Sequence, residues 1–138
     1  MTDFLDTNIL VYAYDKHEPA KQKVARGILE TAFQEENAVI SSQVLSEFFV
    51  VVTRKIATPF TAEEAGNLIS LFRNLPVVEI GGDLVEAAVA VHQRHNISFW
   101  DGLIVAAARL QGCKRLLTED MQSGQTVDGL EIVNPFQP

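Results

Sequence analysis

Short apolar runs alternate along this chain with longer segments in which apolar residues recur every three or four positions. The runs have the length of β-strands and lie at residues 2–6, 38–42, 77–80, 115–117 and 130–136. The segments between them are predicted helices, at residues 18–37, 43–56, 61–73, 82–96 and 99–112, with a further short helix starting near Asn8. This alternation is typical of an α/β fold with a mostly parallel sheet covered on both faces. We expect a single domain over residues 1–138.

Two of the predicted helices carry clear local signals. Pro19 suits the first turn of the helix at 18–37, and its inward face is expected to comprise Val24, Ile28, Leu29 and Phe33. Residues 61–64 read TAEE, which is a capping-box pattern and predicts a helix that starts there.

Composition limits the classes of protein that fit. The longest apolar stretches, FFVVV and LIVAAA, are far shorter than the roughly 20 residues of a membrane span. The first residues, MTDFLDTN, show no basic region followed by an apolar one, so we expect no secretory signal and no membrane association. A single cysteine, Cys113, excludes an internal disulfide and fits a reducing compartment. The expected location is the cytoplasm.

The chain is acidic, with a formal net charge of −7. Taken alone, this charge argues against a nucleic-acid ligand, because phosphate binding usually accompanies a basic surface. The objection weakens if several carboxylates surround divalent cations.

Four acidic residues occupy positions where they could bind a metal or take part in catalysis, and each also has a purely structural explanation. Asp6 follows the first strand, where the carboxyl ends of parallel strands form ligand sites, but it could simply cap the next helix. Glu47 has no lysine or arginine three or four positions away on its helix, so it should bind another group or reach water at the edge of the core.

The other two acids are equally ambiguous when taken singly. Asp101 completes the S-x-x-D capping pattern that begins at Ser98, yet it starts a largely apolar helix and is well placed to hold a metal. Asp120 follows a strand within TEDMQSGQ, where a surface turn is the simpler explanation, and Glu119 stands beside it.

In this order, the motifs DTNIL, SEF, WDGLIVAAA and TED resemble those of the PIN-domain nucleases, and more narrowly the VapC-type toxins of toxin–antitoxin pairs. The resemblance implies a PIN-like three-layer fold and an endoribonuclease that needs Mg²⁺ or Mn²⁺. It implies that Asp6, Glu47, Asp101 and Asp120 bind the metal and catalyse cleavage, with Asp120 favoured over Glu119 by the T-x-D spacing. Asn8 and Thr118 match supporting polar positions. The implied partners are an RNA substrate, a cognate antitoxin protein and a second copy of the chain.

The chemistry explains why such residues would gather. Phosphodiester cleavage needs an activated water and neutralised phosphate charge, and hard divalent cations with carboxylate ligands provide both. Converging carboxylates repel one another and raise their pKa values. We therefore expect a site that is poorly formed and partly protonated without metal.

Basic side chains for the RNA backbone are harder to assign. The candidates are Arg54, Lys55, Arg109, Lys114 and Arg115, each of which could equally be solvated surface. The histidines lie outside the motifs, and we expect His92 and His95 to lie near a helix end as cations rather than to bind metal.

Other classes of protein fit less well. Haloacid dehalogenase phosphatases need D-x-D after the first strand, and here Asn8 stands in place of the second aspartate. No glycine-rich nucleotide-binding motif is present. The remaining alternative is a catalytically silent PIN-like module that only binds partners. The segments ILVYAY and FFVVVTRKI are expected to leave apolar surface for a dimer or a partner groove.

Overall fold

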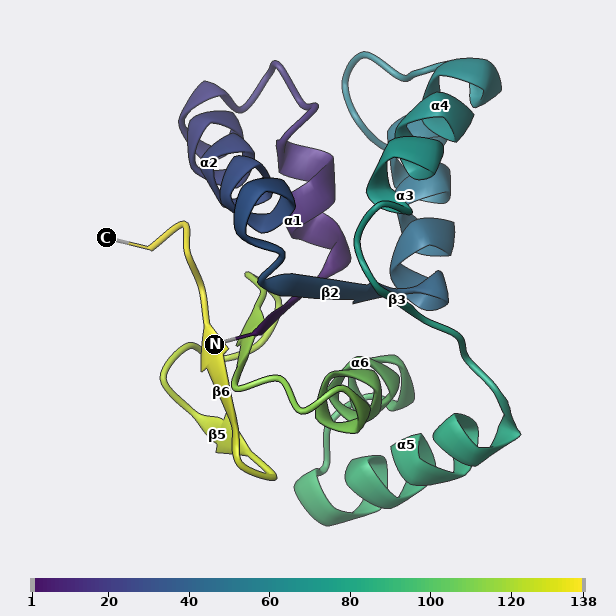
Figure 1. The fold of residues 1–138 in the computed structure, drawn as a ribbon, viewed down its shortest axis with the longest axis vertical. Helices are drawn as coiled ribbons and strands as arrows, with labels where there is room; N and C mark the ends of the chain where they lie inside the picture. Colours follow the sequence, from purple (N-terminus) through teal and green to yellow (C-terminus); the bar gives the residue numbers. More distant parts are fainter. Residues whose placement is uncertain (1, 138) are drawn as a thin grey trace.

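The computed structural model describes residues 2–137, which form a six-stranded sheet and six helices (Figure 1). In chain order the elements are β1 (Asp3–Leu5), α1 (Thr7–Tyr12), α2 (Pro19–Glu35), β2 (Ala38–Ser41), α3 (Ser42–Arg54), α4 (Ala62–Phe72), β3 (Val77–Val78), α5 (Gly82–His95), α6 (Phe99–Leu110), β4 (Arg115–Leu117), β5 (Thr126–Val127) and β6 (Leu130–Val133).

The strands have the spatial order β3-β2-β1-β4-β6-β5, and every pairing is parallel except that of β5 with β6. Helices α1–α4 lie on one side of the sheet and α5 and α6 on the other (Figure 1). The predicted three-layer α/β fold is confirmed. Its carboxyl-end edge, beyond Leu5 and Leu117, is where the candidate residues following β1 and β4 must lie.

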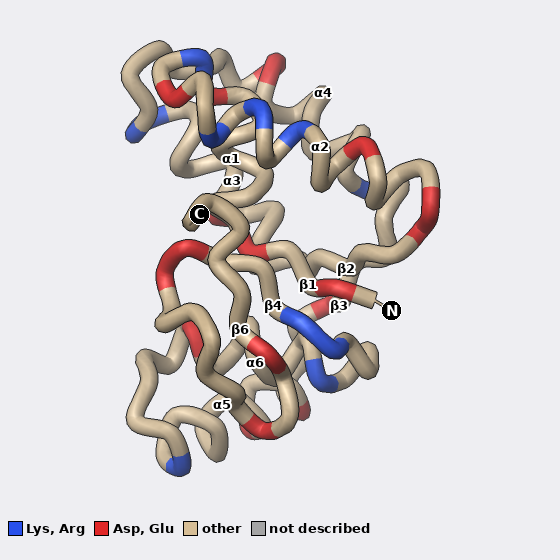
Figure 2. The backbone as a smooth tube through the Cα atoms, turned by 90° about the vertical axis from the view of Figure 1, so that its left-hand side faces the viewer, with Lys and Arg blue, Asp and Glu red and all other residues tan. Residues whose placement is uncertain are grey.

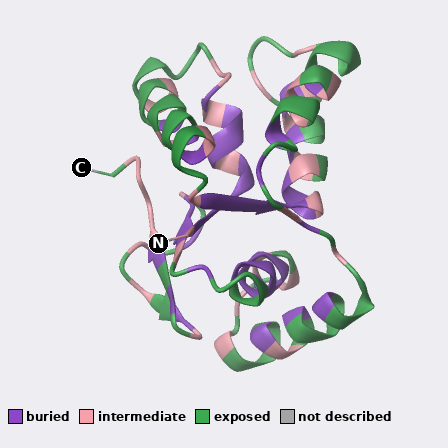
Figure 3. Cartoon of the chain, in the orientation of Figure 1, coloured by how far each residue is buried: buried purple, intermediate pink, exposed green. Residues whose placement is uncertain are grey.

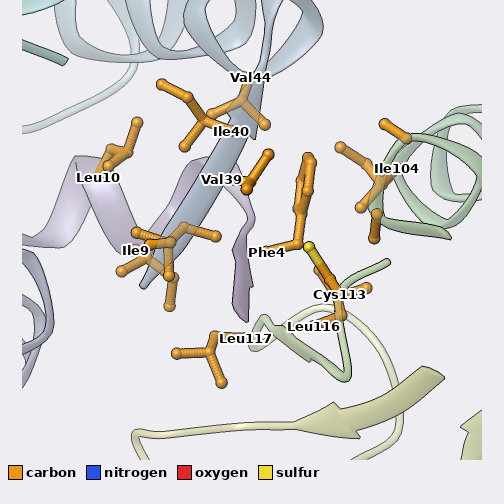
Figure 4. Close-up of a cluster of buried hydrophobic side chains, with 14 of the residues drawn as sticks. Phe4, Ile9, Leu10, Val39, Ile40, Val44, Ile104, Cys113, Leu116 and Leu117 are labelled. Atoms are coloured by element: carbon orange, nitrogen blue, oxygen red, sulfur yellow. The ribbon is translucent and has the colours of Figure 1, made fainter. Parts of the chain in front are cut away.

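The core lies on both faces of the central strands. Phe4, Val39 and Leu116 occupy paired positions on β1, β2 and β4, so their side chains share one face of the sheet, toward Ile104 of α6 (Figure 4). Ile9 of α1 is fully buried on the other side. Buried residues follow the inner sides of all three layers (Figure 3). Within residues 2–137, no helix has the length and apolar character needed to cross a membrane.

The capping signals are largely reproduced. The Thr61 hydroxyl accepts a hydrogen bond from Glu64 N while the Glu64 carboxylate accepts one from Thr61 N, so the predicted capping box is formed. Ser41 caps α3 and Ser98 caps α6, each through its side-chain oxygen. These caps fix where the two helices that carry Glu47 and Asp101 begin.

Some details of the predictions were wrong. Val24 is 39% exposed, because the buried face of α2 runs along Ala25, Leu29 and Ala32. The predicted face comprised large apolar residues, whereas two of the three buried residues of α2 are alanines. Ile9, Leu10 and Val11 of α1 are buried rather than left for a partner, whereas Phe49 and Val50 of α3 are exposed.

Strand β5 was not predicted, although the sequence contains a signal for it. Asp128 and Gly129 both have positive φ angles, 51° and 83°, between β5 and β6. An Asp-Gly pair with two such angles is typical of the tight turn that joins antiparallel strands. The predicted strand at 130–136 therefore ends at Val133 and gains β5 as its neighbour.

Candidate active site

Asp6 lies at the carboxyl end of β1 and is the N-cap of α1. Its Oδ1 accepts a hydrogen bond of 2.7 Å from Thr7 N, and its Oδ2 accepts one of 2.7 Å from the Thr118 hydroxyl. The residue is only 5% exposed. Burial raises the pKa of Asp6 to about 6, against the lowering effect of the two hydrogen bonds and with a further rise from Asp120 and Glu47. Asp6 thus caps a helix and is also a carboxylate whose negative charge the surrounding protein disfavours.

Glu47 lies on α3 and is joined to the start of α1 through Thr7. Its Oε2 accepts from the Thr7 hydroxyl at 2.9 Å and its Oε1 accepts from Gln43 Nε2 at 2.9 Å. Glu47 was expected to bind another group, and in the structure it binds two neutral groups, one of them on α1. Both donors are neutral, so neither bond neutralises the charge of the carboxylate.

Asp101 lies in the first turn of α6 and is half-buried. Its backbone N–H donates to Ser98 Oγ at 3.0 Å, which is one half of the predicted capping box. Burial raises the pKa of the Asp101 carboxyl; the Ser98 side chain lowers it, while Asp120 and Glu47 raise it further. The last two effects show that acids from separate parts of the chain act on one another here.

Asp120 and Glu119 are neighbours in sequence but have different surroundings. Asp120 Oδ2 accepts from Asn8 Nδ2 at 3.2 Å, and Asp120 N donates to Thr118 Oγ1 at 3.0 Å. Glu119 instead accepts from the Tyr12 hydroxyl and, at 3.0 Å, from Lys21 Nζ. Asp120 therefore joins the polar network around Asp6, whereas Glu119 is held by a cation beside it.

Together, Asp6, Glu47, Asp101 and Asp120 form one electrostatic cluster, which we call the acidic cluster. Each pKa rise at Asp6 and Asp101 includes contributions from both Glu47 and Asp120. The side-chain and backbone groups that donate to the carboxylates of Asp6, Glu47 and Asp120 are all neutral. This arrangement concentrates negative charge at the carboxyl ends of β1 and β4.

The carboxylates of the acidic cluster do not form a complete metal-coordination shell. Among residues 2–137, no three His, Cys, Asp or Glu side chains are arranged to hold a metal ion directly. Its oxygen donors nevertheless suit a hard divalent cation, and Mg²⁺ commonly keeps several waters while binding one or two carboxylates. An ion bound there would be held partly through water or after rotation of the more exposed carboxylates.

Two hollows flank Glu47. One, of about 310 Å³, is lined by residues of α1 and α3 and of the loops that follow them, together with Asp120. The other, of about 510 Å³, is lined by Ser42, Gln43, Ser46, Glu47, Ile80, Trp100 and Leu103. Glu47 lines both hollows and Asp120 lines the smaller one, so two members of the acidic cluster border hollows of the surface.

The basic residues are distributed unevenly (Figure 2). Seven of the eleven lysines and arginines belong to the part of the chain that contains α1–α4, namely Lys16, Lys21, Lys23, Arg26, Arg54, Lys55 and Arg73. Arg115, a candidate for the RNA backbone, instead binds Asp3 through two hydrogen bonds of 3.0 and 2.7 Å, at the end of β4 opposite Thr118. Arg54 and Lys55 remain exposed at the end of α3.

A second charged group, around Asp128, was not anticipated. Asp128 accepts hydrogen bonds from Arg94 at 2.5 Å, from His95 at 2.7 Å and from Arg109 at 3.0 Å. These contacts hold the ends of α5 and α6 against the β5–β6 turn and lower the pKa of Asp128, Arg94 contributing most. Arg109, a candidate for the RNA backbone, is therefore paired with Asp128.

The matched family model is described as the PIN domain and covers residues 4–125. No curated protein matches the chain. Among solved structures, a toxin–antitoxin complex from Klebsiella pneumoniae superimposes with a TM-score of 0.71 and 20% identity over 97% of this chain and 98% of that one.

Two further structures share the fold. VapBC2 from Rickettsia felis, bound to a DNA fragment from its promoter, has a TM-score of 0.66 and 22% identity, over 96% of this chain and 97% of that chain. Mycobacterium tuberculosis VapC20, a Sarcin-Ricin loop cleaving toxin, has a TM-score of 0.60 and 20% identity, over 83% of this chain and 87% of that chain. At such identities the likeness concerns the fold. The family match spans most of the chain, and the chain therefore belongs to the PIN domain family.

Proposed function

We propose that this protein is an endoribonuclease that depends on Mg²⁺ or Mn²⁺ and hydrolyses RNA phosphodiester bonds. The observation that carries the proposal is the acidic cluster, in which Asp6 is buried with a pKa of about 6 and the groups that donate to Asp6, Glu47 and Asp120 are all neutral. Such a site is electrostatically unfavourable on its own and is relieved by a bound cation.

In this proposal Asp6, Glu47, Asp101 and Asp120 hold the metal. When bound, a divalent cation supplies an activated water and neutralises charge on the phosphate oxygens. The chain's own contribution is positional: Thr118 orients Asp6 by donating to its Oδ2, and Asn8 orients Asp120. Thr7 and Gln43 do the same for Glu47. These neutral donors fix the carboxylates without cancelling their charge.

We further propose that the protein is the toxin of a toxin–antitoxin pair and acts in the cytoplasm. Family membership and the shared fold with the Klebsiella pneumoniae complex and with VapC20 support this role. Its partners would be a cognate antitoxin and a second copy of the chain. Phe49 and Val50, exposed on α3, are apolar side chains that such a contact could cover.

The test is cleavage of labelled RNA by the purified protein. We expect cleavage with Mg²⁺ or Mn²⁺, none with EDTA, and a loss of at least a hundredfold in Asp6→Asn, roughly the size seen when a key electrostatic group is removed from an enzyme. Asp83→Asn is the matched control, because Asp83 is an exposed acid on α5 outside the acidic cluster.

Two results would contradict the proposal. Cleavage that persists in EDTA or in Asp6→Asn would exclude a metal site at the acidic cluster. If neither metal supports cleavage of any RNA while the protein still binds a partner, the chain is instead a silent PIN-like interaction module.

A further inference from the structure

Trp100 is the only tryptophan of the chain, and it is 62% exposed. It lies in the first turn of α6, immediately before Asp101. The ring of Phe99 contacts it edge-on, with the ring centroids 5.2 Å apart. Tryptophan offers a large apolar surface that proteins usually cover, and exposed examples are common at binding surfaces. The indole is therefore a candidate contact for a ligand.

The hollow beside Trp100 has the size and chemistry of a binding pocket. Of the residues that line its 510 Å³, Ile80, Trp100 and Leu103 are apolar, and Ser42, Gln43 and Ser46 carry hydroxyl or amide groups. A flat apolar wall with a few polar groups at its edge suits a planar heterocycle that carries hydrogen-bonding groups.

Gln43 connects this pocket to the acidic cluster. Its Nε2 donates to Glu47 Oε1 at 2.9 Å and to the Trp100 carbonyl oxygen at 3.3 Å. These bonds link α3 to the first turn of α6, so the pocket keeps a fixed position relative to Glu47 and Asp101. Gln43 is also buried, and its Oε1 has no hydrogen-bond partner among residues 2–137. An acceptor left in this state normally finds a partner, and Gln43 is also one of the residues that line the pocket.

We propose that Trp100 and its pocket bind an unpaired RNA base next to the phosphate that is cleaved. The proposal rests on the proposed ribonuclease function and assigns to Trp100 the role of receiving a base of the RNA. A base within a duplex has both faces covered by its neighbours, whereas an unpaired base exposes one face to stack on an aromatic ring. Because Asp101 adjoins Trp100 in the chain, a base on the indole brings its own or the next phosphate toward the acidic cluster.

The observations favour a base over a protein side chain as the occupant. The pocket is lined by Glu47 as well as by Trp100 rather than lying on a separate apolar face, and a base and its phosphate are covalently joined, so one nucleotide could contact both residues. All four bases can stack on Trp100, so any preference for one base would come from the polar groups at the edge of the pocket.

Because Trp100 is the only tryptophan, its fluorescence reports this contact directly. The experiment titrates the non-cleaving Asp6→Asn protein, in Mg²⁺, with a single-stranded RNA of roughly 12 nucleotides or with the same RNA in a duplex. We expect saturable quenching by the single strand and much weaker quenching by the duplex.

Binding and cleavage by Trp100 variants complete the test. Trp100→Ala should weaken RNA binding by roughly five- to a hundredfold, and Trp100→Phe should retain most of it, because phenylalanine still stacks. Leu110→Ala is the matched control, since Leu110 is 65% exposed at the other end of the same helix. Because both side chains are exposed, neither change should impair folding, and Trp100→Phe keeps the test valid if alanine does.

The outcomes separate this proposal from the ribonuclease function. Metal-dependent cleavage that is unchanged in Trp100→Ala, with no quenching by RNA, overturns the base pocket and leaves the ribonuclease intact. Quenching by single-stranded RNA without cleavage by the wild-type protein supports the pocket and refutes the nuclease. Quenching by a copurifying antitoxin but not by RNA identifies a protein-binding surface and also overturns the proposal.

Discussion

The Thr118 hydroxyl donates to Asp6 Oδ2 across a distance of 2.7 Å and so joins the end of β4 to the end of β1. The same oxygen accepts from Asp120 N at 3.0 Å and from Asn8 Nδ2 at 3.3 Å. Thr118 is fully buried. One hydroxyl therefore organises two of the four members of the acidic cluster.

We predict that Thr118→Val lowers the free energy of unfolding by about 1–3 kcal/mol, the usual cost of leaving buried polar groups unpaired. It should also reduce RNA cleavage, because Asp6 and Asp120 lose a common anchor. Thr118→Ser is the matched control, since it keeps the hydroxyl and should retain most of the stability and activity. Urea unfolding and cleavage rates check this. Equal behaviour of the valine and serine variants would show that the hydroxyl does not position the acids.

Asp6 should make the metal-free protein less stable as pH rises. In the unfolded chain an aspartate loses its proton near the ordinary pKa of 3.8, whereas folded Asp6 keeps it until about pH 6. Between these values the folded state binds more protons, so the free energy of unfolding falls with rising pH and stays reduced above about pH 6. The penalty is about 3 kcal/mol at most.

In EDTA, Asp6→Asn should therefore be more stable than the wild type at about pH 7.5, by about 1 kcal/mol or more after the loss of one accepted hydrogen bond. The difference should vanish or reverse near pH 4, where wild-type Asp6 is also neutral. Mg²⁺ should raise the thermal midpoint of the wild type and leave that of Asp6→Asn nearly unchanged. A wild type that is more stable than the variant at both pH values would show that burial does not penalise this carboxylate.

The alternation of strand and helix was sufficient to predict the layers of this fold. The same reasoning placed Asp6 and the Thr118–Asp120 segment at one edge, because parallel strands β1 and β4 end side by side there. By contrast, the expectation that Glu47 and Asp101 lie near Asp6 came only from the resemblance to the family. Their helices begin beside the same edge, and nothing in the local pattern of either helix specifies its direction.

Contacts between distant residues could not be predicted from spacing. The Thr7 hydroxyl that binds Glu47 lies 40 positions earlier, and Asp3 reaches Arg115 across 112 positions. Such pairings depend on strand register and helix packing rather than on local sequence. The Asp128 cluster was missed for the same reason, although its Asp-Gly turn was a local signal.

The neighbouring carboxylates Glu119 and Asp120 should respond differently to neutralisation. Asp120→Asn is expected to reduce cleavage at least tenfold, with partial recovery at higher Mn²⁺, because Asp120 contributes to the field at Asp6 and Asp101. Glu119→Gln should change cleavage by less than about threefold, since Lys21 already holds this acid. Cleavage rates across a metal titration measure both. A larger effect for Glu119→Gln would assign the fourth position to Glu119.

Gly102 lets α6 approach α5 closely enough to place Asp101 at the site. A Cβ at this position would lie 2.8 Å from the Ala88 carbonyl oxygen, which is closer than carbon atoms approach such groups. Gly102→Ala should lower the free energy of unfolding by about 1–2 kcal/mol, because crowding outweighs the gain in helix propensity, and should reduce cleavage by displacing Asp101. Gly66→Ala on α4 is the matched control: nothing lies within 4 Å of its Cβ, so it should stabilise the protein by about 0.5–1 kcal/mol without affecting cleavage. Chemical unfolding of both variants checks the opposite signs, and stabilisation by Gly102→Ala would mean that the two helices have room to separate.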